Sequence, residues 1–222
     1  LLLAHSWQLI FYVLSAYSFI VLLLVMKYLP DAATIANSTE SNLSVKVKVQ
    51  MSFIQRYKIV LNNAEARLDI LTSMMVSLAF FAYLTAIPYV YLKVFSVSEY
   101  NFSLLFALNV FALMIAHFTN TRFVVRMGSR TMLRVGLTIA VLAATALTLV
   151  NILQLPLIFT VTIIFPLMGS ISLISVNSDA LILTKFPEHS GTVTAVIGTL
   201  RWGIGAFAGP ILAFFYDGSA TP

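Results

Sequence analysis

The amino-acid sequence predicts an all-α membrane protein, a polytopic bundle of about six membrane-spanning helices. Hydrophobic residues make up 60% of the chain and charged residues 9%, whereas a soluble domain has about 25% charged residues. The 222 residues contain several apolar stretches near the length of about 20 residues that a helix needs to cross the hydrocarbon core. Strands are excluded in these stretches because an open sheet edge leaves backbone groups unpaired in lipid.

Six stretches are long and apolar enough to be membrane spans. The third is short and is interrupted by Asn109 and His117, and the fifth is long enough to require tilt or a kink at Pro166. The sixth contains Gly205 and Gly209, a spacing that lets two helix backbones approach closely. In chain order the predicted spans are Trp7–Tyr28, Asp69–Leu92, Phe102–Thr119, Met132–Leu149, Leu155–Thr184 and Thr192–Tyr216.

Basic residues between the spans predict the orientation of the chain. The odd-numbered connections carry eleven Lys and Arg residues, and the even-numbered ones carry only Lys93. Because cytoplasmic loops are enriched in Lys and Arg, the odd-numbered connections are predicted to be cytoplasmic. The basic excess therefore reflects contact with a lipid bilayer, and we expect no nucleic-acid partner.

One long connection separates the first span from the other five. Within it, Ser44–Gln50 alternates Val with polar residues and could form a strand, and Ser52–Arg67 is predicted to be an amphipathic helix along the membrane surface. We therefore divide the chain into three parts. Residues 1–29 form the last helix of an N-terminal half, residues 30–67 a cytoplasmic linker, and residues 68–222 a C-terminal helical half truncated before its final helix.

Two ionisable residues lie inside predicted spans, where an unpaired charge costs several kcal/mol. Asp179 is close to the cytoplasmic end of the fifth span, and Arg201 lies inside the sixth. Two antiparallel helices would place them about four to six residues apart in depth, a gap that an Arg side chain can bridge. The two residues are interpreted either as an ion pair that fixes the helices together or as a proton-sensitive or substrate-sensitive pair lining a path.

The third connection carries Arg122, Arg126, Arg130 and Arg134 at intervals of four residues around Gly128. Topology alone explains them as anchors of a tight turn at the cytoplasmic face. A second interpretation is a gate, in which arginines bond helix C-terminal carbonyls and a neighbouring carboxylate while the inward side is closed. The spacing does not separate the two interpretations.

Three further groups of polar residues have both a functional and a structural interpretation. Tyr83 and Thr85 near the middle of the second span would suit a weakly polar cavity for amphipathic ligands. His117 is a candidate proton carrier, although a single interfacial His is more often a passive polar anchor. Asp69 begins the second span, where a carboxylate suits a helix N-terminus, and we interpret it as structural.

Enzymatic constellations are missing from the sequence. It contains no cysteine, which excludes disulfides and thiolate chemistry. It has no glycine-rich phosphate loop, no acidic or His cluster with metal-ligand spacing and no Ser-His-Asp set that could converge. We therefore expect no cofactor, no metal and no catalytic activity.

Four segments together resemble a known family: FAYLTAIPYVY at 81–91, LFALN at 105–109, NTRFVVRMGSR at 120–130 and FPEHSGTVTAVIGTL at 186–200. They are similar to the Bcr/CflA drug-resistance transporters of the major facilitator superfamily. The resemblance extends from about Asp69 onward, and the first span fits a sixth helix running inward. It implies a partial major facilitator fold holding about helices six to eleven of twelve, in a piece of a longer protein.

The resemblance implies a drug:proton antiporter of the bacterial inner membrane, a multi-pass monomer that exchanges a small lipophilic drug-like substrate for protons. The arginine-rich turn would be the second-half copy of the family's cytoplasmic gating motif, formed by Arg122, Arg126, Gly128 and Arg130. The family's main proton-carrying residues belong to the first half and cannot be assigned here.

Asn177 falls where the family commonly has Asn in its tenth helix. Asp179 and the pair Arg201-Trp202 depart from the family pattern; if the departures are paired, they imply a charge pair particular to this protein and a different choice of substrate. The residues expected to face a substrate cavity are Tyr83, Thr85, Asn109, Asn177 and Arg201.

We expect a multidrug efflux carrier that works by alternating access. One alternative is a proton-coupled transporter of a small metabolite. Another, from a different class, is a non-transporting helical membrane scaffold, which would need no cavity and no charge within the membrane. The presence of Asp179 and Arg201 weighs against a scaffold.

Overall fold

The computed structural model describes residues 8–28 and 52–215 and divides into two compact units, Leu1–Gln50 and Met51–Pro222. Within the first unit, helix α1 (Gln8–Tyr28) is an apolar helix of 21 residues with no buried side chain. An apolar helix whose side chains are all uncovered suits a lipid environment. The strand expected at Ser44–Gln50 lies outside the described residues.

The described residues of the second unit form helices joined by short connections, with no strand among them, which confirms the predicted all-α class. Counting α1, the described residues contain six helices long and apolar enough to cross a membrane, with α4 and its π-helical turn as one and α8 with α9 as one. The elements of this unit are α3 (Phe53–Asn62), α4 (Ala64–Tyr89), the π-helical turn Val90–Val94, α5 (Glu99–Met127), α6 (Ser129–Ile152), α7 (Leu157–Thr184), the 3₁₀ turn Pro187–His189, α8 (Ser190–Ala206) and α9 (Ala208–Phe215).

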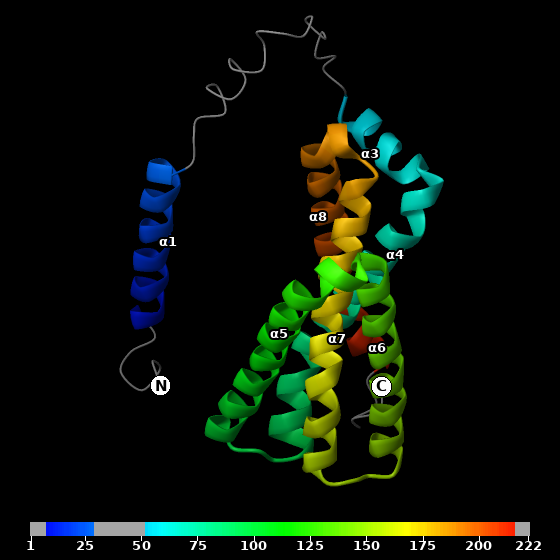
Figure 1. Ribbon diagram of the computed structural model, residues 1–222. Helices are drawn as coiled ribbons and strands as arrows, with labels where there is room; N and C mark the ends of the chain where they lie inside the picture. Colours follow the sequence, from blue (N-terminus) through cyan, green and yellow to red (C-terminus); the bar gives the residue numbers. More distant parts are fainter. Residues whose placement is uncertain (1–7, 29–51, 216–222) are drawn as a thin grey trace, which may run out of the picture. The chain divides into compact units, whose positions relative to one another are not determined.

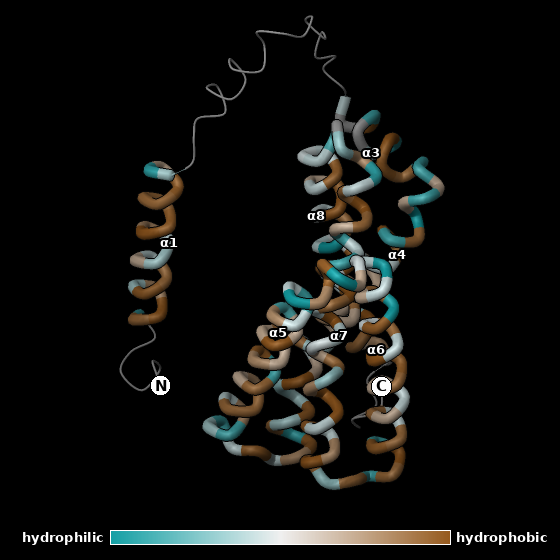
Figure 2. Tube along the Cα trace, in the orientation of Figure 1, coloured by the Kyte–Doolittle hydropathy of each residue, from teal (hydrophilic) through white to brown (hydrophobic). Residues whose placement is uncertain are grey.

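Helix α7 is the central helix of the second unit (Figure 1). It packs along α4, α5 and α6, while α8 and α9 pack against α4. The largest buried apolar cluster joins α4 and the π-helical turn after it to α7, through side chains such as Ile87, Tyr91 and Met168. Figure 2 shows apolar residues along most of α1, α6 and α7 and hydrophilic residues at the turn between α5 and α6. This distribution suits a bundle whose outer surface faces lipid.

The predicted surface helix Ser52–Arg67 is wrong at its C-terminal end. Helix α3 ends at Asn62, and the side chain of Asn63 accepts a hydrogen bond from the backbone N–H of Ala66 at 3.1 Å. An Asn in this position caps a new helix. Arg67 therefore belongs to α4.

The range predicted for the third span, Phe102–Thr119, is shorter than the helix that the structure contains. Helix α5 instead has 29 residues, Glu99–Met127, because Arg is a good helix former and continues the helix beyond the apolar stretch. It ends at Gly128, whose φ of 78° lies in a region that favours glycine. Helix α7, the fifth span, continues through Pro166.

The predicted sixth span consists of two helices that meet at Phe207. Pro210 has no N–H to donate to the carbonyl of Ala206, which favours an interruption there. A Cβ atom added at Gly205 would collide with the Phe81 ring, whereas one added at Gly209 would meet no atom within 4 Å. Only the first glycine of the predicted close-approach pair therefore packs tightly in this structure.

Candidate functional site

Arg201 and Asp179 meet between α8 and α7. Arg201 Nη1 donates to Asp179 Oδ2 at 2.6 Å, and about a third of each side chain is exposed, 30% for Arg201 and 33% for Asp179. The turn at Pro187–His189 makes α7 and α8 neighbours, so an Arg beyond the turn reaches an Asp before it. An ion pair thus joins two membrane-spanning helices at the wall of the bundle.

Three serines complete the hydrogen bonds of this pair. Ser73 Oγ donates to Asp179 Oδ1 at 3.0 Å. Arg201 Nε donates to Ser77 Oγ at 2.8 Å, and Nη2 donates to Ser175 Oγ at 2.7 Å. Sequence reasoning missed these serines, although Ser73 and Ser77 on α4, and Ser175 and Asp179 on α7, have the four-residue spacing of one helix face.

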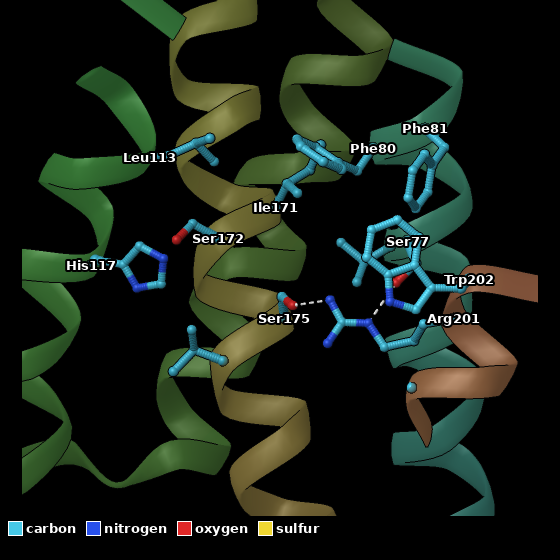
Figure 3. A pocket seen from close by; sticks show the side chains of 13 residues that line it. Ser77, Phe80, Phe81, Leu113, His117, Ile171, Ser172, Ser175, Arg201 and Trp202 are labelled. Carbon is cyan, nitrogen blue, oxygen red and sulfur yellow. Dashed lines mark hydrogen bonds between the residues drawn. The ribbon is translucent and has the colours of Figure 1, made fainter. Parts of the chain in front are cut away.

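A cavity of about 400 Å³ borders the ion pair and is lined by α4, α5, α7 and α8. Figure 3 shows Arg201 reaching Ser77 and Ser175 from one side, and His117 on α5 at the other. Phe80, Phe81 and Trp202 supply the aromatic part of the wall. Of the sequence-predicted cavity residues, Arg201 lines this cavity.

Tyr83 and Asn109 form a separate polar contact between α4 and α5. Asn109 Nδ2 donates to the Tyr83 hydroxyl at 2.6 Å, and Asn109 is buried. Tyr83 lines two other cavities, of about 290 and 530 Å³. Thr85 is exposed, and its hydroxyl donates to the carbonyl of Phe81 in its own helix.

Asn177 joins α7 to α5. Its Nδ2 donates to Asn120 Oδ1 at 2.7 Å and to the carbonyl of Leu173 at 2.8 Å. Asn177 is only 1% exposed, so in this structure it holds two helices together.

Asp69, which the sequence suggested as a helix-start residue, is buried in a charge cluster. Its Oδ2 lies 2.7 Å from Lys185 Nζ and 3.7 Å from Arg130 Nη2. Lys185 Nζ also donates to the carbonyl of Glu65. The cluster joins α4, the end of α7 and the start of α6 at the predicted cytoplasmic end of the bundle.

The remaining arginines of the predicted gate lie on the last two turns of α5. Arg122 and Arg126 line a polar cavity of about 390 Å³ with Phe123. Among the described residues, no carboxylate lies within ion-pair distance of either guanidinium. Gly128 follows them and connects α5 to α6. The structure thus brings Arg130 to a carboxylate, whereas Arg122 and Arg126 have no carboxylate partner in the part of the chain that the structure describes.

A metal site has no support in the part of the chain that the structure describes. No group of three or more His, Asp or Glu side chains is placed to hold a metal ion there. The polar groups that do converge are an ion pair, hydroxyls and an imidazole, which bind and orient small molecules by hydrogen bonds.

Comparisons with known proteins agree with a bundle of membrane-spanning helices. A family model described as Major Facilitator Superfamily matches residues 1–210. The chain is 29% identical over 220 residues to a "Bicyclomycin resistance protein homolog" of Haemophilus influenzae, covering 97% of this chain and 52% of that protein. It is 26% identical over 207 residues to an "Uncharacterized MFS-type transporter YdgK" of Bacillus subtilis, covering 93% and 50%. No solved structure matches the chain significantly.

The chain spans about half the length of the curated relatives it matches. Both relatives are bacterial, and the name of the first agrees with the resemblance to Bcr/CflA-type transporters. The family model covers nearly the whole chain, and the described residues contain six candidate spans. The chain is therefore a multi-pass membrane protein that belongs to the Major Facilitator Superfamily of transporters.

Proposed function

We propose that the whole protein expels a lipophilic drug-like molecule across the bacterial inner membrane in exchange for protons, by alternating access and as a monomer. The observation that carries this proposal is the Asp179–Arg201 ion pair at the wall of a cavity within the bundle. Ionisable groups in membrane spans are costly and mark substrate or proton pathways. A scaffold would need neither the charges nor the cavity.

The ion pair supplies a chemical route by which a proton could change helix packing. Asp179 accepts hydrogen bonds from Ser73 on α4 and from Arg201 on α8. Protonation would remove the negative charge that holds the guanidinium and would weaken both contacts. Since these contacts join α7 to α4 and α8, we propose that proton binding at Asp179 favours a different arrangement of the three helices.

The turn between α5 and α6 is proposed as the cytoplasmic gate. The Arg130 side chain is 55% exposed and its contact with Asp69 is long, at 3.7 Å, so this contact is weak enough to form and break. Lys185 holds Asp69 more closely and would keep the carboxylate in place when Arg130 leaves. Arg122 and Arg126 would then bond partners supplied by another part of the whole protein.

The other predicted cavity residues are proposed to act in a rearranged state. Tyr83 already lines cavities, and Thr85 is exposed beside it. Asn109 and Asn177 are buried in contacts with other helices. Their amides would face a substrate only after α5 moves relative to α4 and α7, a movement of the kind that alternating access requires.

The test is drug accumulation by cells that express the whole reading frame. A drug-sensitive bacterium would be loaded with a lipophilic antibiotic or dye, with and without a protonophore. We expect lower accumulation than in control cells and loss of that difference when the protonophore removes the proton gradient. Lys93→Gln, a change of one basic residue in the π-helical turn, serves as a control for expression and folding.

Two results would redirect the proposal. Unchanged accumulation across a broad panel of drugs, with the protein present in the membrane, would contradict multidrug efflux. Proton-dependent uptake of a small metabolite by the same cells would then favour the metabolite transporter. Efflux that the protonophore leaves intact would contradict the proton exchange but would leave drug efflux standing.

A further inference from the structure

The lining of the cavity beside Arg201 restricts which molecules fit it. Its volume of about 400 Å³ lies in the range of about 300–1,000 Å³ typical of small-molecule sites. The lining has a polar part and an aromatic part, contributed by four helices. In the proposed function this cavity is part of the substrate path, and the ligand class inferred for it rests on that function.

The cavity wall presents a guanidinium and, among the described lining residues, no carboxylate. Among the described lining residues, Arg201 and His117 are the ionisable ones and none is acidic. Asp179 neutralises Arg201 but is not among the lining residues, and its other oxygen accepts from Ser73. A guanidinium has five N–H donors, and Arg201 uses one each on Nε, Nη1 and Nη2. Two of its N–H groups therefore have no acceptor among the described residues and are available to a ligand.

Two further polar groups of the lining have no hydrogen-bond partner among the described residues. Ser172 is 5% exposed, and its Oγ makes no hydrogen bond within the described residues. Buried hydroxyls are normally bonded, so such an atom indicates a missing partner. In Figure 3 the Ser172 hydroxyl points to the side of the cavity that His117 lines, and no described residue bonds the imidazole of His117. Both groups can donate to an acceptor placed between them.

The opposite part of the wall is aromatic. The rings of Phe81 and Trp202 lie 5.2 Å apart between centroids and are tilted by 57°, and Phe80 stands beside Phe81. Gly205 leaves room for the Phe81 ring, because a Cβ atom at that position would collide with the ring. Such rings pack favourably against a planar apolar ligand.

We propose that this cavity binds an aromatic anion, a carboxylate or sulfonate attached to a flat ring system. The anionic group would accept hydrogen bonds from Arg201, Ser172 or His117, and the rings would pack against Phe81 and Trp202. A lipophilic cation of the same size would meet a guanidinium and no lining carboxylate. The site thus selects by charge among molecules of equal hydrophobicity.

Equilibrium dialysis of the purified full-length protein in detergent tests the proposal. The two probes are 2-naphthoate and 2-naphthylmethylammonium, which share one ring system and carry opposite charges. We expect naphthoate to bind at least about tenfold more tightly, the effect of one well-placed charge-assisted hydrogen bond. Ser172→Ala should weaken naphthoate binding about fivefold or more, while Lys93→Gln should leave it unchanged.

The charge preference itself is tested at the ion pair. Arg201→Gln alone leaves Asp179 unpaired and can misfold, so the double variant Asp179→Asn, Arg201→Gln removes both charges at once. We expect it to bind the two probes with affinities within about threefold of each other. Equal binding of the two probes by the unaltered protein, or a preference that survives in the double variant, would overturn the proposal.

This outcome is separable from that of the proposed function, because dialysis requires no proton gradient. Naphthoate binding without protonophore-sensitive efflux would leave the charge-selective site standing and contradict the antiporter. Protonophore-sensitive efflux of lipophilic cations without naphthoate binding would support the antiporter and contradict the charge-selective site.

Discussion

The losses in the free energy of unfolding caused by removing the two charges of the Asp179–Arg201 pair singly should sum to more than the loss caused by removing both together. Two unit charges about 4 Å apart attract by roughly 4 kcal/mol at an effective dielectric constant of about 20. Both side chains are partly exposed, at 30% and 33%, so screening reduces the net interaction. We expect a coupling energy of about 1–2 kcal/mol between Asp179→Asn and Arg201→Gln.

The assay is a double-mutant cycle on the free energy of unfolding of the purified full-length protein in mixed micelles. The matched control pairs Asp179→Asn with Lys93→Gln. Asp179 contacts Ser73, and Lys93 lies twenty residues further along the same helical segment, about 30 Å away by the helical rise. The control pair should be additive within about 0.5 kcal/mol. Additivity of the Asp179 and Arg201 changes as well would show that the pair holds nothing together.

Two further changes test packing and the charge cluster at the predicted cytoplasmic end. Gly205→Ala should destabilise the protein by about 1–3 kcal/mol because its Cβ would collide with the Phe81 ring. A Cβ at Gly198 would meet no atom within 4 Å, so Gly198→Ala should be neutral or stabilising. Thermal unfolding compares the two variants, and equal melting temperatures would contradict the close approach. Asp69→Ala should destabilise the protein by about 3 kcal/mol or more because it leaves Lys185 without its carboxylate. Denaturant unfolding measures the loss, with Lys93→Gln as the matched control. A loss below about 1 kcal/mol would show that the contact contributes little to stability.

The number of spans and the Asp179–Arg201 contact could be predicted because each follows from one-dimensional rules. Apolar length identifies a span, and depth along two antiparallel helices places residues on either side of a turn. Helix boundaries were less predictable. Arginines after Thr119 end the apolar stretch but do not end the helix, so α5 continues to Met127.

The Asp69 cluster was not predictable from the sequence. Lys185 was counted only as a topological charge, and nothing in its spacing from Asp69 identifies a partner 116 positions away. The serines around Arg201 were missed for a related reason. Ser and Thr in membrane helices commonly bond their own backbone, as Thr72 and Thr138 do here. Ser77 also donates to the carbonyl of Ser73, and only the packing of α4, α7 and α8 brings Ser73 and Ser77 to the ion pair as well.

Proton release from reconstituted vesicles addresses the proposed exchange most directly. The purified full-length protein would be placed in liposomes containing a pH-sensitive dye, and a transported drug would be added under an imposed pH gradient. If drug and proton exchange, each addition should dissipate the gradient in proportion to the drug moved, and Asp179→Asn should reduce the response while Lys93→Gln preserves it. Drug movement with no change in the gradient would contradict proton-driven efflux.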